Sequence, residues 1–135
     1  MSFLLDTNFC IALIKRKPQI ALLKIANCQP GQLFISSISA AELRFGACKS
    51  KHSEQNHMAL DQFFVPYELL EFDELSAFHY GVIRSQLESN GTPIGPLDTL
   101  IAAQAVAHDL TLVTNNIREF QRVKRLRIED WTVSA

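Results

Sequence analysis

The sequence lacks a long apolar run and contains few cysteines. None of its apolar stretches approaches the length needed to cross a bilayer, and the N-terminus lacks the basic and then apolar layout of a signal peptide. Its three cysteines, Cys10, Cys28 and Cys48, are odd in number and form no CxxC pair. This pattern argues against a disulfide framework and against a zinc knuckle. The expected location is therefore the cytoplasm, with no membrane among the partners.

A strong excess of one charge is also missing, but the charges are unevenly distributed. The net charge is -1, from 13 basic and 14 acidic residues. Residues 1–51 carry seven basic residues against two acids, residues 52–117 one against nine, and residues 118–135 five against three. Two basic ends around an acidic middle fit either one phosphate-binding face or ordinary solvated surface. Charge alone does not decide between these interpretations.

Short apolar runs alternate with segments of helical periodicity along the whole chain. The 135 residues predict one domain over 1–135. Strands separated by helices indicate an α/β fold with a parallel sheet, in which ligands bind beyond the carboxyl ends of the strands. The segments 6–8 and 114–116 are therefore expected to border the site. The predicted strands are 2–5, 33–36, 67–72, 110–113 and 131–133, and the predicted helices are 7–16, 18–27, 39–50, 53–65, 74–89, 96–107 and 117–120.

Three acids, Asp6, Glu42 and Asp98, lie near the starts of predicted helices. Each has a structural explanation as well as a functional one. Glu42 follows Ser39 at capping-box spacing, and Asp98 lies in a first turn, where the helix dipole favours an acid. Thr7 is expected to cap the first helix, which leaves Asp6 without a structural role. The structural explanation does not account for acids recurring at successive strand-to-helix junctions.

Such acids suit the metal-assisted hydrolysis of phosphodiesters. Magnesium takes oxygen ligands and keeps several waters, so two or three carboxylates are sufficient, and manganese is an acceptable substitute. A bound cation also lowers the pKa of its water, so no side-chain nucleophile is needed. The histidines agree with this chemistry because none stands beside a nucleophile or at metal-ligand spacing, and two are expected on the surface; they are His52, His57, His79 and His108.

Four motifs in order along the chain resemble a PIN domain, and more closely the VapC toxins of bacterial toxin–antitoxin pairs. Each motif is short, but their order and spacing together are specific, and the resemblance covers essentially the whole chain. The motifs lie at 4–8 (LLDTN), 36–46 (SxxSxxELxxG), 94–103 (IGPxDxxIAA) and 112–120 (LVTNNxxEF).

This resemblance implies a fold and a set of catalytic acids. The fold is a single PIN-like domain with a central parallel β-sheet and helices on both sides. The matching positions make Asp6 and Asp98 the metal ligands, with Glu42 either a ligand or a group that orients a water. The implied activity is a magnesium-dependent endoribonuclease.

One corner of the implied site departs from the family pattern. Many PIN domains have a fourth acid just after the late strand, where this chain has Asn115 and Asn116. Asn116 offers a carbonyl oxygen without charge, and Glu119, one helical turn further on, can compensate as a catalytic acid. The resemblance also gives Thr114 a supporting role, because its hydroxyl can orient a water or a phosphate.

The resemblance implies several partners. The substrate is RNA, transfer RNA by expectation and the initiator species as the narrower guess. A cognate antitoxin is expected to neutralise the toxin by placing its tail in the active-site groove. A homodimer and a higher toxin–antitoxin complex are also expected, with operator DNA contacted only through the antitoxin. A basic rim is expected to hold the RNA backbone; it consists of Lys15, Arg16, Lys17, Arg44, Lys49 and Arg84.

Other classes of protein compete with this interpretation. A haloacid-dehalogenase-type phosphohydrolase needs a second Asp two residues after its nucleophile, but Asn8 stands there. A response-regulator receiver needs a Lys after the late strand, where this chain has Thr114. A PIN-like module that binds RNA or protein with little or no cleavage remains open because the fourth acid is missing. Metal-dependent cleavage distinguishes it from an enzyme.

Overall fold

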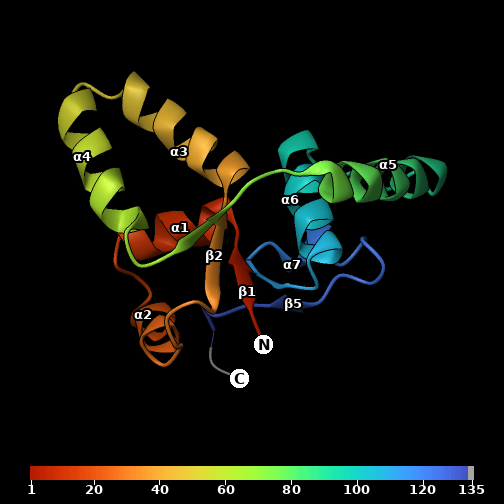
Figure 1. Ribbon diagram of the computed structural model, residues 1–135, viewed down its shortest axis with the longest axis horizontal. Coiled ribbons are helices and arrows are strands. Elements are labelled where there is room, and N and C mark those ends of the chain that lie inside the picture. Colours follow the sequence, from red (N-terminus) through yellow and green to blue (C-terminus); the bar gives the residue numbers. More distant parts are fainter. Residues whose placement is uncertain (134–135) are drawn as a thin grey trace.

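The computed structural model describes residues 1–133, and this part of the chain folds around one parallel sheet. The strands are ordered β3-β2-β1-β4-β5, and every neighbouring pair is parallel. Helices cover both faces of the sheet (Figure 1), which confirms the predicted α/β architecture. In chain order the elements are β1 (Phe3–Leu5), α1 (Thr7–Ile14), α2 (Gln19–Ala26), β2 (Leu33–Ser36), α3 (Ser37–Lys49), α4 (Ser53–Phe64), β3 (Glu68–Leu70), α5 (Glu74–Ser89), α6 (Pro96–Ala107), β4 (Thr111–Val113), α7 (Ile117–Phe120) and β5 (Ile128–Glu129).

The central strand β1 is apolar because both of its faces are buried. Leu5 belongs to a core that is covered by α1, α2, α3 and α4. Leu4 points to the opposite core, which α5, α6 and α7 cover. Neither leucine is exposed to solvent, as expected for a strand in the middle of a parallel sheet.

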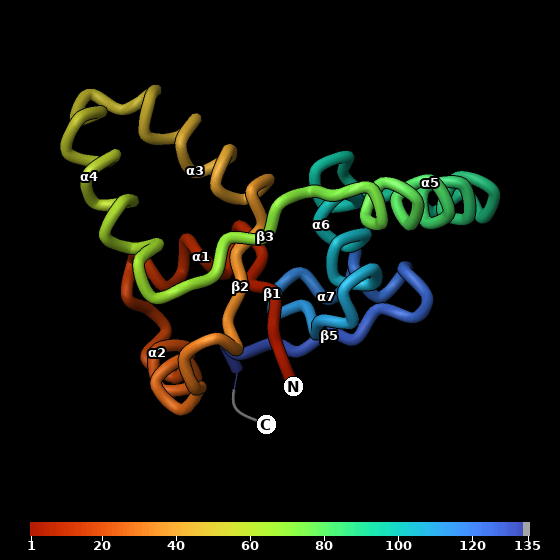
Figure 2. The backbone as a smooth tube through the Cα atoms, in the orientation of Figure 1, coloured from red at the N-terminus to blue at the C-terminus, as the bar shows by residue number. Residues whose placement is uncertain are grey.

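The strand order reverses between β1 and β4. The chain leaves β1 toward β2 and β3 on one side, then returns through α5 and α6 to place β4 on the other side of β1. Such a switch point leaves a crevice outside the carboxyl ends of the two strands, where ligands bind in open α/β sheets. Beyond this edge, the α3–α4 hairpin and α5 extend to opposite sides (Figures 1 and 2).

A buried glutamine connects the elements beneath that edge. Gln104 on α6 is fully buried; its Oε1 accepts a hydrogen bond from the hydroxyl of Ser36, and its Nε2 donates to the carbonyl of Leu70 at 3.1 Å. The same Ser36 hydroxyl accepts from the backbone N–H of Ile38 at 2.9 Å and so begins α3. Gln104 therefore fixes α6 relative to the ends of β2 and β3.

The last predicted strand is wrong in position. Residues 128–129, rather than 131–133, pair with β4. The ring of Trp131 instead packs edge-on against Phe3 and Phe9, with ring centroids 4.8 and 5.9 Å away. Its indole N–H donates to Glu129 at 2.9 Å. Burial of the large indole in the core prevails over the strand-like alternation of this segment.

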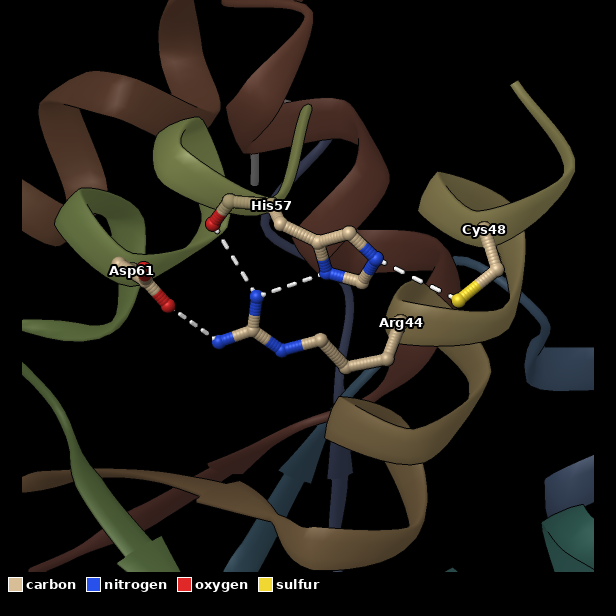
Figure 3. A network of polar contacts seen from close by, with 4 residues as sticks. All are labelled: Arg44, Cys48, His57 and Asp61. Atoms are coloured by element: carbon tan, nitrogen blue, oxygen red, sulfur yellow. Dashed lines mark hydrogen bonds and ion pairs between the residues drawn. The ribbon is translucent and has the colours of Figure 1, made fainter. Parts of the chain in front are cut away.

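The α3–α4 hairpin is held by a polar network around Arg44 (Figure 3). Arg44 pairs with Asp61 and donates to both the carbonyl oxygen and the ring Nδ1 of His57, each at 3.1 Å. The Nε2 of this half-buried histidine lies 3.3 Å from Cys48 Sγ. Arg44, a member of the basic rim expected for RNA, therefore also braces the hairpin.

Arg44 is not alone among the cations of the expected basic rim in pairing with an acid. Arg84, another expected member of the rim, pairs with Glu88 on its own helix. The end of α1 and the segment that follows α7 lie on opposite sides of the molecule (Figure 1). Within residues 1–133, no helix combines the length and the apolar character needed to span a membrane.

Candidate active site

Asp6 is the first residue beyond β1, at the switch point of the sheet. Its backbone N–H donates to the carbonyl of Val113 at 3.0 Å, which ties it to the end of β4. Its carboxylate accepts from the backbone N–H of Phe9 at 2.7 Å, so Asp6 itself is the N-cap of α1. The predicted capping role of Thr7 is therefore wrong. The hydroxyl of Thr7 is instead free to reach α3.

Glu42 lies on α3 and faces α1. The predicted capping box with Ser39 does not form, because α3 begins two residues earlier than predicted, with Ser36 as its N-cap. Glu42 then lies in the second turn, too far from the helix start to cap it. Its Oε1 accepts a hydrogen bond from the Thr7 hydroxyl at 2.6 Å.

Asp98 and Glu119 meet at the other side of the crevice. Asp98 lies in the first turn of α6, as predicted, and Glu119 on α7 lies close enough for its charge to raise the pKa of Asp98. Asn116 Nδ2 donates to Glu119 Oε2 at 3.1 Å. The buried hydroxyl of Thr114 accepts from the backbone N–H of Asn116 at 2.9 Å. The segment 114–116 thus supports Glu119.

The electrostatics indicate that the four predicted acids are close neighbours. Burial raises the pKa of Asp6 to about 6; hydrogen bonds from Thr114 and a backbone N–H oppose this rise, and the charges of Asp98 and Glu42 add to it. Burial likewise raises the pKa of Asp98 to about 6, helped by the charges of Glu119 and Glu42. Clusters of acids with perturbed pKa values are typical of functional sites.

The donor chemistry of the crevice fits a hard divalent cation. Its side chains offer carboxylate, hydroxyl and amide oxygens, which are the ligands that magnesium and manganese prefer. Within residues 1–133, no three His, Cys, Asp or Glu side chains converge tightly enough to form a ready-made cage. Magnesium does not require one, because it keeps several waters and completes its shell with substrate oxygens.

Sequence reasoning missed the contacts of Thr7 and Ser39 at this site. Both residues lie within the motifs that it singled out, and Ser39 stands three residues before Glu42. The spacing was interpreted as a cap within one helix. The observed hydrogen bonds instead connect α1 to α3. Thr7 is separated from Ser39 by 32 positions and from Glu42 by 35, and no local pattern predicts contacts over such distances in the sequence.

The fold and the cluster of acids at the switch point of the sheet define the class of protein. The sequence model of the family described as PIN domain matches residues 3–126 of this chain. The chain therefore belongs to the PIN-domain family.

Full-length relatives place it with the VapC ribonucleases of that family. The "tRNA(fMet)-specific endonuclease VapC" of Salmonella typhimurium is 44% identical over 131 residues, which are 97% of this chain and 98% of the relative. "Ribonuclease VapC2" of Rickettsia felis is 43% identical over 97% of this chain and 98% of its own length. The structure of DNA-bound VapBC from Salmonella typhimurium matches with a TM-score of 0.91 at 44% identity, covering 97% of this chain and 98% of that chain. VapBC-1 from nontypeable Haemophilus influenzae matches with a TM-score of 0.92 at 36% identity, covering 98% and 100%.

Proposed function

We propose that this protein is a metal-dependent endoribonuclease toxin that hydrolyses RNA phosphodiesters. The observation that carries the proposal is the gathering of Asp6, Glu42, Asp98 and Glu119 from four separate helices at the switch point of the sheet. Burying several like charges together costs stability, so a stable fold retains them for a function. Residues 1–135 make up the proposed nuclease domain.

We assign roles by position in the crevice. Asp6, which is buried, and Asp98, which is half-buried, hold Mg²⁺ or Mn²⁺, and Glu42 either joins them or orients a water. When bound, the cation neutralises phosphate charge and lowers the pKa of a water. Glu119 takes the place of the missing fourth acid and is held by Asn116. Thr114 restrains Asp6 from the neighbouring strand.

The substrate proposal rests on the relatives. Two of them, from Salmonella typhimurium and Shigella flexneri, are named tRNA(fMet)-specific endonucleases at 44% and 42% identity. We propose transfer RNA as the substrate of this chain and the initiator species as its specific target. Mapping the cut sites on RNA from cells that express the protein identifies that target.

We expect cleavage that depends on a divalent cation. Purified protein, freed of antitoxin, is incubated with total transfer RNA in magnesium, in manganese, or in EDTA. Discrete cleavage products are expected with either cation and none with EDTA, since the carboxylates need a cation to act on a phosphodiester. A protein that retains RNA without cutting it in magnesium would instead be a PIN-like binding module.

We further propose that an antitoxin binds an apolar groove next to the site. The groove has a volume of about 460 Å³ and lies between α1, α3 and α4, with Leu43 and Phe63 in its wall and Arg16 at its rim. α1 begins beside Asp6, and α3 carries Glu42, so an occupant of the groove contacts both site-bearing helices. Relatives crystallise as VapBC complexes, and an apolar antitoxin segment with an acidic end suits this lining. A homodimer and a higher complex with the antitoxin complete the proposed assembly.

The groove predicts a variant that separates inhibition from cleavage. Ile14 lines the groove and is 42% exposed, so Ile14→Glu leaves the core intact. Losing the burial of one isoleucine costs about 1.5–3 kcal/mol, so antitoxin affinity is expected to fall at least about tenfold. Calorimetric titration with the cognate antitoxin measures the loss, and RNA cleavage is expected to stay at the parental rate. Leu23→Glu, the same kind of change at an exposed apolar residue of α2 that does not line the groove, is the matched control. Equal affinity losses in both variants would place the antitoxin elsewhere.

A further inference from the structure

A chain of two hydroxyls links α1 to the carboxylate of Glu42. The Oγ1 of Thr7 lies 2.6 Å from Glu42 Oε1 and 2.8 Å from Ser39 Oγ. Ser39 and Glu42 are one turn apart on α3, whereas Thr7 is the first residue of α1. Ser39 is fully buried, so its hydroxyl is withdrawn from bulk water, and Thr7 is half-buried.

The number of protons available for donation fixes the direction of these two hydrogen bonds. A carboxylate only accepts hydrogen bonds, and a threonine hydroxyl has one proton to donate. The proton of Thr7 therefore goes to Glu42, and the contact with Ser39 requires the Ser39 hydroxyl to donate to Thr7. The resulting order is Ser39 to Thr7 to Glu42.

The Glu42 side chain needs such a restraint. It has three rotatable bonds, and the negative charges of Asp6 and Asp98 lie close enough for Glu42 to raise the pKa of each. Repulsion from those charges favours rotamers that turn the carboxylate toward solvent. The bond from Thr7 opposes this tendency and engages one carboxylate oxygen, which leaves the other oxygen available for a further partner.

We propose that Thr7 and Ser39 are positioning residues, which hold the Glu42 carboxylate in place for the divalent cation and its waters. This inference rests on the proposed metal-dependent function. It explains why the residue after Asp6 carries a hydroxyl although Asp6 itself caps the helix. Partners that orient a metal-binding group commonly contribute 10–100-fold to metal affinity or activity.

The test is a double-mutant cycle read out by Mn²⁺ binding without RNA. Thr7→Val keeps the shape of the side chain and removes the hydroxyl, whereas Thr7→Ser keeps the hydroxyl. Mn²⁺ affinity, measured by calorimetry on the full chain, is expected to fall roughly tenfold in Thr7→Val and to stay within about twofold of the parent in Thr7→Ser. In the Glu42→Gln background, Thr7→Val is expected to cause no further loss, because Thr7 acts through Glu42.

The same set of variants includes a substitution of Ser39. Ser39→Ala is expected to weaken Mn²⁺ binding less than Thr7→Val, and to have no effect once Thr7 is valine, because Ser39 acts through Thr7. Two results would overturn the inference: Thr7→Ser weakening binding as much as Thr7→Val, or Thr7→Val costing the same with and without Glu42. A parent that binds no Mn²⁺ and cuts no RNA would contradict the proposed function itself. A parent that cuts RNA, with Thr7→Val unchanged, contradicts only the positioning role.

Discussion

Asp98→Asn is expected to abolish cation-dependent cleavage of transfer RNA while leaving the fold intact. Asparagine has the same shape but no charge, so the crevice loses one of the two carboxylates proposed to hold the cation. Loss of a supporting group around a metal commonly costs 10–100-fold, so loss of a direct ligand is expected to cost more than about 100-fold in rate. Single-turnover cleavage assays in saturating magnesium measure this rate.

The matched control makes the same chemical change at the opposite end of the sheet. Asp109 is exposed and precedes β4, with a φ of +56° that asparagine adopts readily. Asp109→Asn is expected to cut RNA at the parental rate. A near-parental rate in Asp98→Asn would refute the metal assignment. Circular dichroism confirms that both variants remain folded.

Asp6→Asn is expected to stabilise the metal-free protein even though it inactivates the enzyme. The Asp6 carboxyl is 2% exposed, and burial raises its pKa from 3.8 to about 6. A shift of this size costs the charged form about 3 kcal/mol in the folded state. Asparagine keeps the N-cap oxygen and avoids this cost, so the free energy of unfolding in EDTA at pH 7 is expected to rise by about 2–3 kcal/mol.

The sign of the pH dependence follows from the same shift. Because the folded pKa lies above the unfolded one, the folded state binds the proton more tightly. The parent therefore loses stability relative to the variant as pH rises from about 4 to about 6. Above that range the difference is constant. Urea unfolding in EDTA across this pH range measures the difference in the free energy of unfolding between the parent and the variant. Glu71→Gln, at an exposed position, is the charge-matched control. A variant no more stable than the parent at pH 7 would contradict the raised pKa.

Magnesium is expected to reduce the difference in the free energy of unfolding between Asp6→Asn and the parent. A cation held by the carboxylates binds the folded parent and stabilises it by mass action, whereas the variant lacks one ligand. The free energy of unfolding of the parent should therefore rise with added magnesium more than that of Asp6→Asn. An equal response of the two proteins would place the cation away from Asp6.

Much of the fold was predictable because its signals are local. The run at 3–5 is apolar since β1 is buried on both faces, and Pro96 marks the start of α6. The periodicity of 74–89 and 117–120 predicted α5 and α7 with the observed bounds. Errors arose where a tertiary contact competed with a local pattern. Trp131 packs in the core rather than in the predicted strand, and the Thr7 hydroxyl donates to Glu42 instead of capping α1.

The same contrast between local signals and tertiary contacts applies to the candidate site. The placement of Asp6 and Asp98 at strand-to-helix junctions could be inferred from the sequence, since topology brings the carboxyl ends of parallel strands to one edge. The partner of each acid could not be inferred. A capping box explained Glu42 as well as a site did, and only the observed start of α3 at Ser36 separates the two explanations.

The sequence by itself determined the parallel α/β fold, the acids that border its crevice and the resemblance to VapC ribonucleases, because periodicity, turn residues and motif spacing are properties of neighbouring residues. Only the tertiary structure decided that Asp6 caps its own helix, that Thr7 and Ser39 hold Glu42, and that Glu119 reaches Asp98. Apart from the cap formed by Asp6, these contacts join separate helices. Their existence depends on how the helices pack against the sheet, which no local pattern encodes.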